Sequence, residues 1–173
     1  MKTIILTTVL LLIFPPVFGQ NTRQDKKAER KALKTTLQME IKTVVENKNF
    51  KIKVNRAIPL RGGSISLTSP YDIAVHEDVA TAYLPYFGVS HQAEYGSSEG
   101  GIKFSEPMLH YTTKFNKRKG YIISFEVKTQ KNYYGITINV GMAGYATVDI
   151  NSLYSDSINY SGELIFEESK STE

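Results

Sequence analysis

The sequence of 173 residues contains no cysteine and no tryptophan. The absence of cysteine excludes disulfide bonds, thiolate metal sites and lipid attachment at an N-terminal cysteine of the mature protein. Walker loops, dinucleotide-binding fingerprints and calcium-binding loops are also missing from the sequence. We therefore expect one domain without a cofactor, large enough to bury about two-thirds of its unfolded surface.

Long hydrophobic runs are scarce, and the one that stands out is at the N-terminus. Lys2 precedes an apolar run from Ile4 to Phe14, which is too short to span a bilayer. Small residues near Gly19 complete the pattern of a secretory signal peptide. We expect cleavage after Gly19 and a mature protein located in the periplasm or elsewhere in the cell envelope. An uncleaved membrane anchor is the alternative.

Positive charge is confined to one segment. The formal net charge is +4, yet residues 48–173 carry thirteen basic and thirteen acidic side chains. Residues 21–47 carry seven Lys or Arg against four Asp or Glu. A dedicated nucleic-acid-binding domain would show a basic face within its fold, so nucleic acid is not an expected partner.

The basic segment, residues 20–48, predicts a helix. Apolar residues recur at steps of three and four, which makes one stripe, at Leu33, Leu37, Ile41, Val44 and Val45. We expect the face from Leu33 to Val45 to pack against the rest of the domain, the polar stretch from Arg23 to Lys34 to fray, and Asn47 to end the helix. A basic amphipathic helix can also lie on an anionic membrane. The stripe is short and lacks aromatics, so membrane contact is expected to be peripheral at most.

Residues 49–166 alternate between apolar and polar side chains, the period of a half-buried strand. Turn-forming residues, with Pro59 and Pro70 among them, separate about nine or ten such runs. The runs follow one another along the chain as a meander. We predict a mainly β protein: an antiparallel up-and-down, lipocalin-like β-barrel preceded by one N-terminal amphipathic helix. The polar tail, residues 167–173, is expected to be disordered.

Three short motifs carry a family resemblance: Asp78-Val79-Ala80, Leu84-Pro85-Tyr86-Phe87-Gly88 and Gly100-Gly101-Ile102-Lys103-Phe104. Together they resemble the bacterial secreted family known as domain of unknown function 4251. The resemblance implies an exported envelope protein of Gram-negative gut-type bacteria with a mostly antiparallel β-barrel fold. It brings no known activity and no site residues.

Catalytic patterns are weak. Gly96 to Gly100 matches the G-x-S-x-G pattern around Ser98, but that motif requires a strand-to-helix elbow, and a strand is expected to follow here. His91 and Glu94 could form an acid–base pair, although nothing nearby supplies a nucleophile. The three histidines lack metal-binding spacing. We expect no catalytic residue and no metal site, with a hydrolase using His91, Glu94 and Ser98 as an alternative.

Aromatic residues indicate a binding surface. The chain has eleven tyrosines, and rings concentrate around one loop, at Tyr83, Tyr86, Phe87 and Tyr95, with Phe104 returning beside them. Barrel mouths commonly hold small ligands. The expected function is therefore a non-enzymatic exported envelope module that binds a small apolar ligand or an envelope protein there. The alternatives are rings that merely cap the core and a purely structural envelope component.

Overall fold

A computed structural model describes residues 21–89, 101–117 and 120–166. One helix and eight strands follow in order: α1 (Asn21–Glu46), β1 (Asn49–Pro59), β2 (Ile65–His76), β3 (Val79–Pro85), β4 (Gly101–Asn116), β5 (Gly120–Lys128), β6 (Tyr133–Val140), β7 (Tyr145–Ser152) and β8 (Ile158–Ile165). The predicted signal peptide and C-terminal tail lie outside the described residues. The described chain divides into two units, one ending at Leu33 and one beginning at Lys34.

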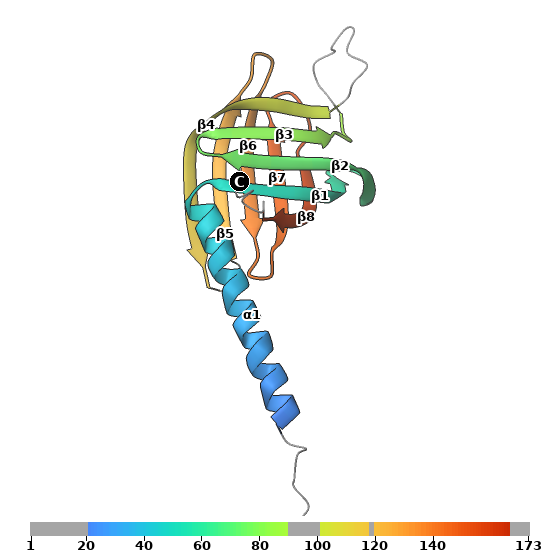
Figure 1. The fold of residues 1–173 in the computed structure, drawn as a ribbon. Helices are drawn as coiled ribbons and strands as arrows, with labels where there is room; N and C mark the ends of the chain where they lie inside the picture. Colours follow the sequence, from blue (N-terminus) through green and yellow to red (C-terminus); the bar gives the residue numbers. More distant parts are fainter. Residues whose placement is uncertain (1–20, 90–100, 118–119, 167–173) are drawn as a thin grey trace, which may run out of the picture. The chain divides into compact units, whose positions relative to one another are not determined.

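The eight strands close into a barrel in which every strand pairs antiparallel with its neighbours in sequence, and β8 pairs with β1 (Figure 1). The predicted up-and-down barrel with one N-terminal helix is confirmed. Because consecutive strands are antiparallel neighbours, no crossover connection is needed. Closure leaves no long unpaired edge that could recruit another chain.

Alternating side chains fill the interior of the barrel. On β5, β6 and β7 every second residue is buried, and the buried set consists mostly of β-branched residues such as Ile123, Ile138 and Val148. Among the described residues no polar or charged side chain is classed as buried, apart from tyrosines within the core. An eight-stranded barrel is just wide enough for its own side chains to fill it. The interior is therefore a packed core.

The structure has eight strands where the sequence pattern predicted nine or ten, because two prolines lie inside strands. Pro70 belongs to β2, between Ser66 and Tyr71, where the ladder with β1 skips several residues. Pro107 belongs to β4 and is the last residue paired with β3 before β4 turns to β5. At such irregular positions and ladder ends a missing N–H costs no regular hydrogen bond. Each proline therefore lies within a long strand instead of ending it.

The last turns of α1 belong to the core of the second unit. Ile41 and Val45 are buried, and Leu37 and Val44 are partly buried against the core. Leu33 is 64% exposed, so the prediction that the packed stripe begins there is wrong. The predicted fraying is not seen either, because α1 is continuous from Asn21, as expected for a run rich in Ala, Lys, Arg and Glu.

The helix ends at Glu46, so Asn47 is the first residue beyond it, as predicted. Lys48, rather than Asn47, has the left-handed backbone conformation, with φ of 50°. Its carbonyl oxygen accepts a hydrogen bond from the backbone N–H of Glu77, and its Nζ lies 2.7 Å from Asp78 Oδ1. The junction between α1 and β1 is thus tied to the β2–β3 turn. Along the described part of the chain, α1 lacks the run of apolar residues that a membrane-crossing helix requires.

Candidate functional site at the barrel mouth

The aromatic residues predicted to form a site do not share one surface. Phe104 is only 8% exposed and its ring stacks on Tyr134 inside the barrel, with centroids 5.5 Å apart. Tyr83 is 45% exposed on the outer wall, stacked on Tyr71 and covered by Lys103 Nζ. Tyr83 alternates with the buried Ala82 and Leu84, which explains its outward direction.

Tyr86 and Phe87 lie together just after β3, partly buried against the core. The Tyr86 hydroxyl donates toward two backbone oxygens, that of Asp156 at 3.0 Å and that of Val89 at 3.2 Å. Burial raises the pKa of Tyr86. A side chain at Gly88 would collide with the Tyr86 hydroxyl, so a larger residue there would displace this ring. Tyr86 thus joins the segment after β3 to the segment before β8.

A second tyrosine closes the barrel beneath this turn. Tyr160 on β8 is fully buried, and its hydroxyl donates a hydrogen bond of 2.8 Å to the carbonyl oxygen of Pro85. Burial strongly raises the pKa of Tyr160, with smaller contributions from Tyr86 and Tyr134. The rings of Tyr160, Tyr134 and Phe104 occupy the mouth end of the interior. A ligand at this end must therefore lie among the loops, outside the core.

The loops form a cavity of about 490 Å³. Its walls come from three connections that are distant in sequence: the β1–β2 loop, the segment after β3 and the segment before β8. The lining residues are Pro59, Arg61, Gly62, Gly63, Ser64, Ile65, Phe87, Gly88, Val89 and Asp156. Apolar groups dominate, and Arg61 supplies the positive charge. The hydrogen bonds of Tyr86 hold two of these residues, Val89 and Asp156, in position.

Of the predicted site residues that the structure describes, only Phe87 lines this cavity. Tyr95 falls outside the described residues, as do His91, Glu94 and Ser98 of the alternative hydrolase. The β1–β2 loop was missed because Arg61-Gly62-Gly63 reads as turn punctuation, and its approach to Phe87 depends on the closure of the barrel. An arginine followed by two glycines was the one available signal.

Comparison with known proteins identifies the family. Residues 32–164 match the family described as domain of unknown function DUF4251. The chain belongs to this family. A crystal structure of a DUF4251 protein from Bacteroides eggerthii is similar in fold, with a TM-score of 0.58 and 20% sequence identity over 75% of this chain and 87% of that one. No functionally curated protein matches the sequence.

This DUF4251 chain carries one further polar cluster that sequence reasoning missed, on the outer wall. The carboxylate of Glu126 on β5 accepts hydrogen bonds from His110 Nδ1, at 2.6 Å, and from the Tyr133 hydroxyl. Both hydrogen bonds lower the pKa of Glu126, and the bond from Tyr133 has the larger effect. The same bond raises the pKa of Tyr133. His110 occupies a β-bulge with φ of 52°. No spacing rule reveals the cluster because its members come from three strands.

Polar side chains around the β2–β3 turn do not converge on one site. His76 Nδ1 lies 3.2 Å from Asn49 Oδ1, whereas Asp78 pairs with Lys48, so the polar side chains take separate partners. Within the described ranges, no three His, Asp or Glu side chains come together as a metal site.

Proposed function

We propose that this DUF4251 protein is a non-enzymatic binding module of the cell envelope that holds a small apolar ligand at the barrel mouth. The observation that carries the proposal is the cavity of about 490 Å³ between the three loops. Sites for small molecules are typically concave, mostly apolar and roughly 300–1,000 Å³ in volume. The sequence pattern of a signal peptide supports export to the envelope.

The chemistry of the lining suggests the ligand class. Phe87, Ile65 and Val89 offer apolar and aromatic contact, whereas Arg61 offers a cation with several N–H donors. A ligand with an apolar body and an acidic or hydrogen-bond-accepting end would contact both the apolar residues and Arg61. The glycines of the β1–β2 loop leave room for close approach by such a molecule.

A fluorescent probe with this chemistry tests the site directly. Anilinonaphthalene sulfonate combines fused aromatic rings with an anionic group, and we expect its fluorescence to rise on binding the wild-type protein. The double variant Phe87→Ala/Arg61→Gln should weaken this binding at least tenfold. Tyr83→Ala is the matched control, since it removes an aromatic ring from the outer wall, away from the cavity.

Thermal unfolding of each variant separates binding from stability. The proposal fails if the double variant binds the probe as well as wild type while remaining folded, or if Tyr83→Ala weakens binding equally. If the proposal holds, native mass spectrometry of protein purified from its own host would identify the natural ligand. Intact mass of the same material tests export, with cleavage after Gly19 expected.

A further inference from the structure

The first half of α1 carries a one-sided charge pattern. In the unit that ends at Leu33, the exposed cations Lys26, Lys27, Arg30 and Lys31 follow one another at helical spacing. At about 100° per residue these four side chains fall within an arc of roughly 140° on the helix surface. All residues from Gln24 to Leu33 are exposed.

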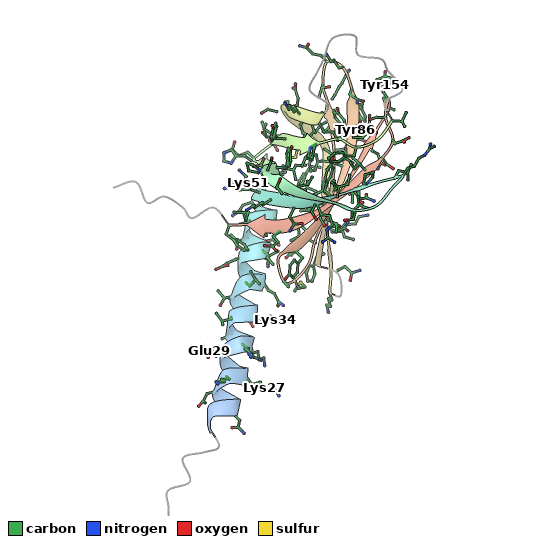
Figure 2. The ribbon with its side chains drawn as sticks, turned by 90° about the vertical axis from the view of Figure 1, so that its right-hand side faces the viewer. Lys27, Glu29, Lys34, Lys51, Tyr86 and Tyr154 are labelled. Carbon is green, nitrogen blue, oxygen red and sulfur yellow. The ribbon has the colours of Figure 1, made fainter. Side chains whose placement is uncertain are left out.

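The anions of this unit lie on the other side. Asp25 and Glu29 point between about 130° and 170° away from the centre of the cationic arc, by the same geometry. Figure 2 labels Lys27 and Glu29 on this stretch. Lys26 and Glu29 are the one opposite-charge pair at a step of three or four among residues 24–33, whereas like charges recur at these steps, which disfavours a solvated helix. An external negative surface would offset this repulsion among the cations.

We propose that Lys26, Lys27, Arg30 and Lys31 form an electrostatic docking face for an anionic lipid membrane. A cationic face that covers roughly 140° of the helix over about one and a half turns matches a flat layer of negatively charged headgroups. Nucleic acid is a poorer match, since residues 48–173 carry equal numbers of basic and acidic side chains and so supply no net charge beyond the helix. The apolar side chains needed for deep insertion are absent from this face, so the contact is a surface contact.

Such a contact is reversible and sensitive to salt. Each Lys or Arg near an anionic surface strengthens binding roughly fivefold, so the four together contribute on the order of several hundredfold. Raising the salt from about 0.1 M to 1 M shortens the Debye length from about 10 Å to 3 Å and should abolish most of this gain. The docking face is independent of the ligand site proposed at the barrel mouth.

Co-sedimentation of the full chain with lipid vesicles tests the proposal. We expect binding to phosphatidylcholine vesicles that contain phosphatidylglycerol, and much weaker binding to phosphatidylcholine alone. The variant Lys26→Gln/Lys27→Gln/Arg30→Gln/Lys31→Gln should lose the difference between the two. The matched control Lys53→Gln/Lys114→Gln/Lys117→Gln/Lys128→Gln removes the same charge from exposed barrel positions and should keep it.

A charge-swapped helix separates pattern from total charge. Asp25→Lys/Lys26→Asp/Glu29→Arg/Arg30→Glu keeps composition and net charge but places two anions inside the cationic arc, and we expect it to lose most binding. Far-ultraviolet circular dichroism confirms that the helix persists. Equal binding by the swapped variant, equal loss in the barrel control, or duplex DNA binding at a salt concentration where anionic vesicles fail would each overturn the proposal.

Discussion

Removing the Tyr160 hydroxyl isolates one buried hydrogen bond at the mouth of the barrel. Tyr160→Phe keeps the ring in the core but leaves the carbonyl oxygen of Pro85 without its partner at 2.8 Å. Leaving a buried acceptor unsatisfied costs about 1–3 kcal/mol. For a protein of this size, a loss of about 2 kcal/mol lowers Tm by roughly 4–8 °C.

Alkaline pH adds a second and independent signature. Burial raises the pKa of Tyr160 in the folded protein above its ordinary value of about 10. The stability from this shift is fully present below pH 10 and is lost as pH rises toward the folded pKa, since only the unfolded chain then releases the proton. The loss is about 1.4 kcal/mol of unfolding free energy for each pH unit. Tyr160→Phe lacks this titration, so its stability should approach that of wild type by roughly pH 11 to 12.

Denaturant unfolding followed by circular dichroism, at neutral pH and at several alkaline values, measures both effects. Tyr83→Phe is the control, because its ring lies on the exposed outer wall, and its free energy of unfolding should stay within about 0.5 kcal/mol of wild type. Tyr160→Phe with wild-type stability at neutral pH would refute the inference that this hydroxyl closes the interior. A constant gap across alkaline pH would refute the assigned pKa direction.

Three further predictions concern the helix, the turn and the outer wall. Ile41→Ala should lower the free energy of unfolding by about 2–4 kcal/mol, since the side chain is buried, whereas Leu33→Ala should change it by less than about 0.5 kcal/mol in the same denaturant titration. Gly88→Ala should displace Tyr86 and weaken probe binding at the mouth, whereas a variant that binds the probe normally would contradict the turn geometry. Glu126 has a lowered pKa when folded, so its contribution is present above its unfolded pKa and lost as pH falls through the folded value. Glu126→Gln should therefore make acid unfolding less dependent on pH, as measured by thermal melts between about pH 3 and 6.

The barrel could be predicted from the sequence because each strand carries its own evidence. One buried face requires apolar residues at every second position, and that pattern survives whatever the neighbouring strands do. The strand count was wrong because proline can either end a strand or lie inside one. Pro70 reads as a strand end, yet it lies inside β2 where the ladder with β1 is irregular, and Pro107 likewise lies inside β4 where that strand changes partner. Only the pairing register shows that an N–H is not needed there.

The candidate site was harder to predict because its residues share no period. Phe87 was identified from local ring density, but Arg61 and Asp156 come to it only through the closure of eight strands. Conversely, the alternation that buried Phe104 was visible in the sequence, since Ile102 and Phe104 point the same way. The alternation of buried and exposed residues along a strand is therefore better evidence than closeness to an aromatic loop for deciding whether a ring belongs to the core or to a site.

The two ends of the barrel are closed by different means, and this limits where function can lie. At one end Val45 of α1 packs into the core, and its carbonyl oxygen lies 3.4 Å from the Tyr111 hydroxyl on β4. At the other end the Tyr160 hydroxyl holds the backbone of Pro85 across the mouth. Buried side chains of the described strands lie between the two ends, so a ligand inside the barrel would have to displace core residues. Binding at the mouth loops or on the outer surface needs no such displacement, and substitutions there change recognition at little cost to the fold.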